Sequence, residues 1–337
     1  MNLRARDSVD VSLYVGLDLG GSGTRAALVD ADGRLLASGT AQTGLLGAGA
    51  AGRRHLARAL DAALASIAPR VGAARCSVFA GTRGLSIPGR RESLMLELST
   101  RFSDAEVRVS NDALIALWGA LAGRQGVAVL AGTGSIALAR SEDGREGRAG
   151  GWGHLLGDEG SGYWLGREAL AAYLRTIEGR ETEGALSSVV GSAVGQRSVT
   201  DAIAWLHSGD QQVTRLAALA PLVSQAAQAG DNTALDILRR AGQALADQAA
   251  AAARQVWDAS PPRDLPVARC GGIWSAGPPL SDPFALALGT QVPETRMTQA
   301  RLAPVGGAVL LAMGADRRAL PSSIPDKLAE AFAPREL

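Results

Sequence analysis

One segment of the sequence occurs twice, as GSGTRAALVDADGR at residues 21–34 and as GTGSIALARSEDGR at residues 132–145. Each copy runs from a Gly-x-Gly turn with a hydroxyl residue, through an alternating apolar stretch, to an Asp-Gly turn. Hydrophobic runs separated by such turns are typical of successive antiparallel strands. The repeat therefore predicts two similar β-hairpins, each with a glycine-rich tip, and favours two similar domains.

The two glycine-rich tips are candidates for phosphate binding, because glycine lets backbone N–H groups come close to phosphate oxygens. Two tips that face each other could hold a polyphosphate from both sides. Thr24 and either Thr133 or Ser135 would then serve as hydroxyl donors. A single hairpin of this kind would otherwise be an ordinary tight turn.

Three other nucleotide-binding patterns fit the sequence less well. The first copy satisfies the dinucleotide pattern G-x-G-x-x-A at Gly21, Gly23 and Ala26. That pattern must open a helix, and the Asp-Gly turn at 32–33 follows too soon for one. The sequence contains no G-K-[ST] of a Walker A loop, and its only lysine is Lys327, which excludes the strand lysine of protein kinases.

Asp18 stands near the end of the first expected strand, where the second copy has Val129. An acidic side chain beside a phosphate-binding loop repels the phosphate unless a cation lies between them. Mg²⁺ prefers carboxylate, water and phosphate oxygens as ligands, so Asp18 is the candidate magnesium partner, through a water molecule. The alternative is a carboxylate that serves only the strand end or the turn.

A second acid, Asp112, ends the strand-like run VRVSND (107–112) and precedes a helix expected over 113–122. Catalytic groups are often exposed at such junctions, on rigid elements. Phosphoryl transfer to an alcohol needs a carboxylate that accepts the hydroxyl proton and orients the oxygen. Asp112 is therefore the candidate base, and the alternative is that Asn111 or Asp112 merely caps the helix.

The run GGWGHLLGDEGSGYWLG at 150–166 combines many glycines with two tryptophans that flank Asp158 and Glu159. Sugar sites often combine aromatic or apolar walls with a few carboxylates that accept hydrogen bonds from hydroxyl groups. The run is therefore a candidate sugar-binding segment. The alternative is a glycine-rich loop in which Asp158 or Ser161 caps a helix over 162–175.

Hydrophobic periodicity gives the whole chain an α/β pattern. The repeat restarts near 122–126, which favours domains over 1–122 and 123–337, with a helical insertion over 182–256 in the second. The Gly- and Ala-rich segment 41–53 is expected to form a loop. The expected strands cover 12–18, 24–30, 34–40, 76–81, 107–112, 126–132 and 266–272, and the expected helices cover 53–68, 90–102, 113–122, 162–175 and 301–313.

The 34 basic and 33 acidic residues nearly balance, so no strong field favours nucleic acid or a membrane surface. No apolar run approaches the roughly 20 residues that a membrane-spanning helix needs, and the first ten residues lack the apolar core of a signal peptide. Cys76 and Cys270 fit no C-x-x-C spacing, so neither a zinc site nor an iron–sulfur cluster is indicated. We therefore predict a cytoplasmic protein.

Motifs in order along the chain resemble those of the sugar kinases in the actin, heat-shock-70 and hexokinase superfamily. More narrowly, they resemble the N-acetylglucosamine kinases and the related BadF/BadG-type ATPases, and the motif at 150–161 is the most specific. The matching segments are LDLGGSGTR (17–25), SNDA (110–113), AGTGS (131–135) and GGWGHLLGDEGS (150–161), with AQAGD (227–231), CGGIW (270–274) and PVGGA (304–308) at nucleotide-side positions.

The resemblance implies two RNase-H-like domains of the actin/hexokinase type, with an active-site cleft between them that closes over ATP and a sugar. It also allows the last helix to pack back on the N-terminal domain. The implied activity is phosphorylation of an amino sugar at its 6-hydroxyl by ATP and Mg²⁺, with N-acetyl-D-glucosamine as the first candidate. The family also suggests a homodimer.

The resemblance also implies roles for the matching residues. Asp112 would be the base on the 6-hydroxyl, and Asp18 remains the magnesium partner. The sugar would be bound by Asn111, Asp112, Gly151, Trp152, Gly153 and Asp158, and the nucleotide by Gly21, Gly23, Thr24, Gly132, Thr133, Gly134, Ser135, Ala227, Gly271 and Gly272.

Two positions depart from the N-acetylglucosamine kinase pattern. Ile136 follows T-G-S where those kinases have Asn, and Gly44 stands where they have a sugar-facing Asn. Loss of two hydrogen-bonding amides changes which substrate group can be recognised, so glucosamine or another hexose is an alternative acceptor. Two further alternatives are an ATPase that activates a radical enzyme, which the distant Cys76 and Cys270 do not favour, and a sugar sensor without kinase activity.

Overall fold

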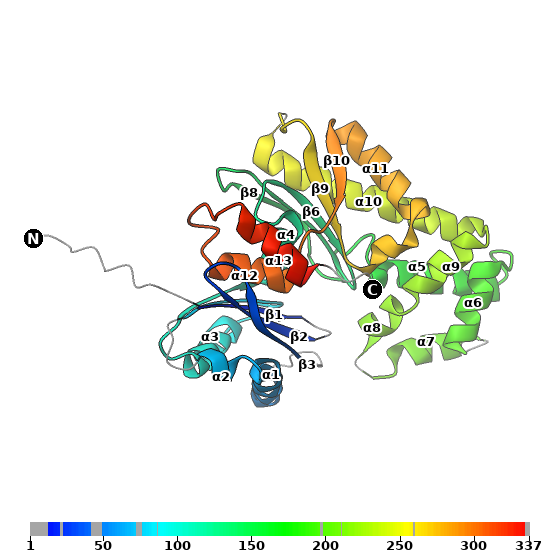
Figure 1. Ribbon diagram of the computed structural model, residues 1–337. Helices are drawn as coiled ribbons and strands as arrows, with labels where there is room; N and C mark the ends of the chain where they lie inside the picture. The colour runs from blue at the N-terminus through cyan, green and yellow to red at the C-terminus, as the bar shows by residue number, and fades with distance from the viewer. Residues whose placement is uncertain are drawn as a thin grey trace, which may run out of the picture. The chain divides into compact units, whose positions relative to one another are not determined.

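The computed structural model describes residues 13–20, 23–41, 49–71, 76–85, 87–195, 198–209, 211–258 and 260–333. The chain forms two compact units, coloured from blue to red along the sequence in Figure 1. The first unit contains the residues up to Arg124 together with those from Ala300 onward, and the second contains Gln125–Gln299. The border expected from the sequence lies at 122/123, and the C-terminal segment returns to the first unit, as the family resemblance allows for the last helix.

The first unit contains a five-stranded sheet with the strand order β3-β2-β1-β4-β5. The first three strands in sequence pair in antiparallel sense, whereas β1, β4 and β5 are parallel. The carboxyl ends of these three parallel strands therefore meet at one edge of the sheet. The strands are β1 (Leu13–Leu19), β2 (Thr24–Asp30), β3 (Leu35–Ala41), β4 (Cys76–Thr82) and β5 (Glu106–Asn111).

Helices cover both faces of this sheet. Successive side chains of a strand point to opposite faces, so neighbouring strand residues belong to two different hydrophobic clusters. Val15 and Leu17 belong to one hydrophobic cluster, and Tyr14 and Phe79 belong to another. The first cluster includes residues of α1 (Gly49–Leu64) and α3 (Arg90–Arg101). The second includes residues of α4 (Asp112–Leu121), α12 (Pro304–Ala312) and α13 (Ser323–Phe332). The short helix α2 (Ala68–Val71) follows α1.

The C-terminal segment belongs to the first unit because α12 packs closely on α4. The N–H groups of Arg301 and Leu302 donate to carbonyl oxygens near the end of α4, both at 3.0 Å. Gly307 comes so close to α4 that a Cβ at this position would overlap the carbonyl oxygen of Ile115. The two helices are far apart in the sequence, so no local pattern predicts this contact.

The second unit repeats the plan of the first, with the strand order β10-β9-β6-β7-β8. Again three strands are antiparallel, and β6, β9 and β10 are parallel. The two sheets therefore have the same order and the same strand directions. The strands are β6 (Gly126–Ala131), β7 (Ser135–Arg140), β8 (Glu146–Gly150), β9 (Leu265–Cys270) and β10 (Thr295–Gln299).

A long helical insertion separates β8 from β9 in the second unit. Its last helix, α10, packs against β7 and β8 (Figure 1). No helix within the described parts of the chain combines the length and the apolar character needed to cross a membrane. The helices are α5 (Gly162–Ile177), α6 (Ala185–Val194), α7 (Val199–His207), α8 (Gln212–Ala217), α9 (Ala220–Gln228) and α10 (Asn232–Trp257), followed after β9 by the 3₁₀ helix η1 (Gly272–Ala276) and α11 (Pro278–Gln291).

The two predicted β-hairpins are confirmed. Leu19 pairs with Thr24 across the first tip, and Ala131 pairs with Ser135 across the second. The likeness also extends to the third antiparallel strand of each sheet, since β3 and β8 follow the two Asp-Gly turns. The sequence repeat does not extend to the parallel strands that follow. In the second unit the long helical insertion comes before β9, whereas only α1 and α2 come before β4 in the first unit.

Several stretches differ from the sequence-based expectation, and two of them are instructive. The helix expected from residue 53 already begins at Gly49, so part of the expected loop over 41–53 is helical, while 42–48 lies outside the described residues. No element was expected over 278–299, where the structure has α11 and β10. Proline usually argues against a helix, but Pro278 occupies the first helical position, where an N–H has no intrahelical partner to lose.

Candidate functional site

The first glycine-rich tip joins β1 to β2. The N–H of Gly20 donates to the carbonyl oxygen of Gly23 at 3.0 Å, which closes the turn. Thr24 begins β2 directly after the turn and is buried. Gly21, which the sequence also assigns to this tip, lies outside the described residues.

Asp18 lies near the end of β1, opposite Arg25 in the strand register. Its carboxylate is buried, and its Oδ2 lies 3.5 Å from Nη1 of Arg25. Burial raises the pKa of Asp18 to about 6, because the charged form loses hydration. The charge of Arg25 lowers this pKa, and the charge of Asp112 raises it.

The surroundings of Asp18 fit a magnesium ion that takes most of its ligands from elsewhere. Among the described residues, no three acidic, histidine or cysteine side chains form a metal-binding group. Mg²⁺ usually keeps several waters and combines one or two carboxylates with substrate phosphates. A single buried carboxylate beside a glycine-rich turn matches that donor set, with the phosphate and water supplying the rest.

The raised pKa of Asp18 leads to a test of stability. Folding raises the pKa of the Asp18 carboxyl from 3.8 to about 6, so the folded state favours the protonated carboxyl. The contribution of Asp18 to stability is therefore fully present below pH 3.8 and is lost as the pH rises through about 6. The shift corresponds to about 3 kcal/mol at most. We expect Asp18→Asn, which cannot ionise, to become more stable relative to the parent protein between about pH 4 and pH 7.

This test measures the free energy of urea unfolding at each pH for both proteins. Asp104→Asn, which removes an exposed carboxylate from the same unit, is the matched control and is expected to follow the parent protein. A pH profile of Asp18→Asn that runs parallel to that of the parent protein would contradict the raised pKa.

Asp112 is the first residue of α4 and directly follows β5. The helix cap comes from its neighbour, since Oδ1 of Asn111 accepts from the N–H of Leu114 at 2.7 Å. The alternative that Asp112 is the capping residue is therefore wrong. Its Oδ2 instead accepts from Nε of Arg83 at 3.1 Å, and the Asp112 side chain is 32% exposed.

The second glycine-rich tip is joined to the start of α5. The N–H of Gly132 donates to the carbonyl oxygen of Gly134 at 2.9 Å. The carbonyl oxygen of Gly132 accepts from the N–H of Gly162 at 2.7 Å, and that of Thr133 accepts from Tyr163 at 3.2 Å. The second tip and the run at 150–166 are separate motifs in the sequence, but these hydrogen bonds join them into one structure.

Asp158 contacts the second tip directly. It adopts a positive φ of 61°, and its Oδ1 accepts from the N–H of Ser135 at 3.1 Å. The hydroxyl of Ser135 donates in turn to the carbonyl oxygen of Glu159 at 2.8 Å. A Cβ on Gly134 would lie 2.9 Å from the Asp158 carboxylate, so glycine is needed for this approach. Asp158 thus fastens the tip, and its proposed contact with a sugar stays a prediction.

The two tryptophans of the run at 150–166 have different surroundings. Trp152 is 67% exposed, between Gly151 and Gly153, which both have positive φ. Trp164 is buried in α5, whose cap is the side chain of Ser161. Of the two tryptophans, only Trp152 is therefore accessible to a ligand.

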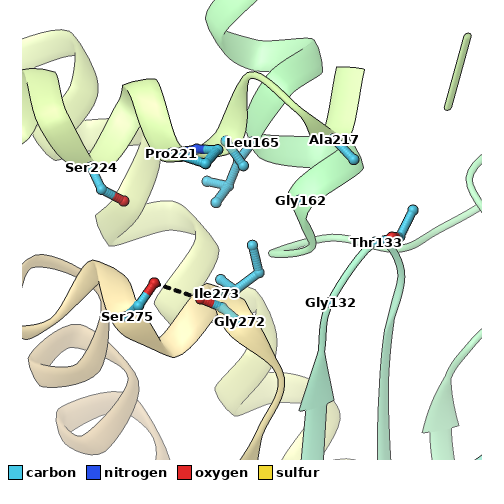
Figure 2. A pocket seen from close by; sticks show the side chains of 11 residues that line it. Gly132, Thr133, Gly162, Leu165, Ala217, Pro221, Ser224, Gly272, Ile273 and Ser275 are labelled. Atoms are coloured by element: carbon cyan, nitrogen blue, oxygen red, sulfur yellow. Dashed lines mark hydrogen bonds between the residues drawn. The ribbon is translucent and has the colours of Figure 1, made fainter. Parts of the chain in front are cut away.

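A cavity of about 230 Å³ lies in the second unit beside the second tip (Figure 2). Figure 2 shows Thr133 at one side of it and Ser224 and Ser275 at the other, and Ser275 donates to the carbonyl oxygen of Gly272 at 2.7 Å. Three of its lining residues, Gly132, Thr133 and Gly272, are among the predicted nucleotide-binding residues. The lining consists of Gly132, Thr133, Gly162, Leu165, Ala217, Ala220, Pro221, Ser224, Gly272, Ile273 and Ser275.

Two other predicted nucleotide residues lie near this cavity without lining it. Ala227 is buried on α9, one turn beyond Ser224. Gly271 has a φ of 100°, and a Cβ there would overlap the carbonyl oxygen of Ala131, so glycine lets the end of β9 approach β6. The Ala-rich stretch 182–256 predicts helices from its periodicity, but this pattern does not show which face of α9 meets the cavity. The sequence therefore does not identify Ser224 as a lining residue.

Ile136, one of the two departures from the kinase pattern, lies against the candidate sugar segment. A Cβ on Gly151 would lie 2.7 Å from Cδ1 of Ile136, so the two residues are in close contact. An apolar side chain therefore stands where the N-acetylglucosamine kinase pattern has Asn. Gly44, the other departure, lies outside the described residues.

Comparison with known proteins agrees with this arrangement. An N-acetylmuramic acid/N-acetylglucosamine kinase of Clostridium acetobutylicum is 30% identical over 207 residues, which are 61% of this chain and 67% of that protein. An N-acetyl-D-glucosamine kinase of Dictyostelium discoideum is 30% identical over 211 residues, or 62% of this chain and 66% of that protein. The chain thus spans about two thirds of the length of these relatives.

Structure comparison and a family model extend the likeness to most of the chain. The crystal structure of a candidate N-acetylglucosamine kinase from Chromobacterium violaceum matches with a TM-score of 0.69 and 31% identity, over 90% of this chain and 99% of that one. The expected α/β fold with two RNase-H-like domains is thereby confirmed. The model of the BadF/BadG/BcrA/BcrD ATPase family matches residues 15–312. The chain therefore belongs to the BadF/BadG/BcrA/BcrD ATPase family.

Proposed function

We propose that this protein is an ATP-dependent sugar kinase that phosphorylates the 6-hydroxyl of an amino sugar, with N-acetyl-D-glucosamine as the first candidate. The placement of Asp112 supports this proposal most directly. Its carboxylate lies at the junction of β5 and α4, partly exposed, while Asn111 provides the helix cap. An acid that the helix does not need as a cap is available to accept a proton.

The nucleotide would be bound by both glycine-rich tips and by the cavity in the second unit. Backbone N–H groups of the tips suit phosphate oxygens, and the cavity has small and apolar walls that suit a base and its ribose. Asp18 would hold magnesium through water, and bound magnesium would supply positive charge to the phosphate oxygens. The phosphate residues would be Gly21, Gly23, Thr24, Gly132, Thr133, Gly134 and Ser135, with Ala227, Gly271 and Gly272 on the adenosine side.

The acceptor sugar would be held by residues from both units. Asn111 and Asp112 belong to the first unit, and Gly151, Trp152, Gly153 and Asp158 belong to the second. Asp112 would take the proton from the 6-hydroxyl while that oxygen attacks the terminal phosphorus of ATP. The cleft between the two domains, which the family resemblance implies, is part of this proposal.

One observation favours a different acceptor within the same activity. Ile136 lies against Gly151 in the candidate sugar segment, so an amide that could bind a polar substituent is missing there. A site without that hydrogen bond discriminates less strongly between a sugar that has the polar group and one that lacks it. Glucosamine or glucose is therefore the second candidate acceptor.

The test is a coupled assay of ADP release with Mg·ATP and each of five sugars: N-acetylglucosamine, glucosamine, N-acetylmannosamine, glucose and N-acetylmuramic acid. Phosphorus NMR of the product then locates the phosphate, because a 6-phosphate couples to the two methylene protons on C6, whereas a phosphate at a ring carbon couples to one proton. A preference for N-acetylglucosamine supports the first candidate. No ADP release with any sugar would overturn the kinase proposal and favour a sensor or an ATPase of another kind.

Filling the cavity gives a specific prediction for nucleotide binding. Ser224→Trp would place an indole in the space beside Thr133 and Ser275, so we expect the KM for ATP to rise about tenfold or more, a loss of about 1.4 kcal/mol. The KM for the sugar should change little. Ser192→Trp, on an exposed position of α6, is the matched control. An unchanged KM for ATP in Ser224→Trp would mean that the nucleotide binds elsewhere.

From the charge balance and the lack of a long apolar run we also propose a cytoplasmic protein that binds neither nucleic acid nor membranes, and from the family resemblance we propose a homodimer. Light scattering coupled to gel filtration tests the dimer. A monomeric mass at assay concentrations would overturn that part without affecting the kinase proposal.

A further inference from the structure

Arg83 lies between the first glycine-rich tip and the candidate base. It directly follows β4, the strand that separates β1 from β5 in the sheet. In the strand register, Thr82 pairs with Leu19 on one side and with Asn111 on the other. The residues that follow these strand ends are therefore neighbours, and Arg83 is the middle one.

The contact between Arg83 and Asp112 uses defined atoms. Nε of Arg83 donates to Oδ2 of Asp112 at 3.1 Å. Among the described residues, no hydrogen bond to Oδ1 of Asp112 accompanies it. The bond therefore holds one carboxylate oxygen and leaves the other for a further partner.

Stability alone gives a weak reason for this pair. The Arg83 side chain is 54% exposed and that of Asp112 is 32% exposed. Ion pairs with such exposure stabilise a protein by about 0–1 kcal/mol. What the pair does determine is the orientation of Asp112, because a guanidinium is planar and its Nε has one fixed direction of donation.

The charge of Arg83 also acts on the neighbouring acid at the tip. Asp18 pairs with Gly81 in the strand register, two residues before Arg83. Two carboxylates near one another repel, and a guanidinium close to both reduces that repulsion. Arg83 is thus placed to reduce repulsion between Asp18 and Asp112 while it holds Oδ2 of Asp112.

We propose that Arg83 is a positioning residue, which fixes the Asp112 carboxylate so that Oδ1 receives the proton of the acceptor hydroxyl. This inference rests on the proposed kinase function. In the step, the acceptor oxygen forms a bond to the terminal phosphorus of ATP, its proton passes to Oδ1, and the bond from phosphorus to the bridging oxygen breaks with its electron pair leaving on ADP.

The test compares Arg83→Gln, Arg83→Ala and Arg83→Lys with Arg317→Gln. Arg317 also pairs with an acid in the same unit, at 2.7 Å from Glu106, and its side chain is 56% exposed, so it controls for the loss of one surface ion pair. Because misplacement of a reacting group can cost about 10²-fold, we expect the Gln and Ala variants to lose about 10- to 100-fold in kcat. Their KM values should stay within about threefold, and their melting temperatures should match that of Arg317→Gln.

Chemical rescue separates positioning from charge. Guanidinium ion at non-denaturing concentration should raise the kcat of Arg83→Ala by about fivefold or more, whereas potassium chloride at equal ionic strength should not, since only guanidinium restores the planar donor. Guanidinium should have no such effect on Asp112→Asn. Full activity of Arg83→Lys would show that charge suffices, and would overturn the inference, as would a kcat of Arg83→Gln within about twofold of the parent protein.

The two proposals can fail separately. If the parent protein phosphorylates no sugar, the kinase proposal fails, and hydrolysis of ATP by water then tests Arg83, because a water molecule takes the place of the acceptor hydroxyl. A lower hydrolysis rate in Arg83→Gln, restored by guanidinium in Arg83→Ala, would support the inference. Equal rates in the parent protein and all Arg83 variants would overturn it.

Discussion

Asp112→Asn is expected to lower kcat for sugar phosphorylation by about 10²–10⁴-fold, the range for loss of a general base. Asparagine has nearly the same shape but cannot accept the hydroxyl proton. The fold of α4 should survive, because Asn111 provides its cap. The KM for ATP should stay within about threefold of the parent value, since Asp112 is not proposed to bind the nucleotide. Steady-state kinetics with the preferred sugar measure both quantities.

Asp104→Asn is the matched control for this experiment, because Asp104 is an exposed carboxylate of the same unit outside the candidate site. It is expected to retain full kcat. Activity of Asp112→Asn close to that of the parent protein would show that another group accepts the proton, and the kinase fold would remain.

The second large effect concerns stability. Gly307→Ala is expected to lower the free energy of unfolding by on the order of 3 kcal/mol, the upper part of the range for an overpacked core. The added Cβ would overlap the carbonyl oxygen of Ile115 and would lie 2.5 Å from the backbone nitrogen of Gly119. Backbone atoms cannot turn aside as a flexible side chain can, so α12 would have to move away from α4.

Gly289→Ala is the matched control, because a Cβ at this position of α11 meets no atom within 4 Å. Alanine favours a helix over glycine by about 1 kcal/mol, so this variant should be as stable as the parent protein or more stable. Urea unfolding of the three proteins gives the comparison. A Gly307→Ala variant as stable as the parent protein would contradict the close packing of α12 on α4.

The movement of α12 also matters for function. α4 begins with Asp112 and contains Ile115, so a shift at this interface changes the support of the candidate base. We therefore expect Gly307→Ala to lower kcat as well as stability, whereas Gly289→Ala should leave kcat unchanged.

The hairpins were predictable from sequence because their chemistry is local. An apolar alternation, a Gly-x-Gly turn and an Asp-Gly turn are all contained within a few neighbouring residues, and the structure has antiparallel pairs at both places. The same holds for Asp112 at a strand-to-helix junction, since the period of the apolar residues changes there. The family resemblance added the fold of two similar domains, and the comparisons bear it out.

Long-range contacts were decided only by the tertiary structure. The pairing of β6 with β9, the return of α12 to α4 and the bond from Arg83 to Asp112 each join segments that are separated in the chain. The same is true of Ser224 and Ser275, which line one cavity from α9 and η1. Local propensity and periodicity determine which residues form an element and which face is apolar. Which partner covers that face depends on the packing of the whole chain, and no short stretch of sequence contains that information.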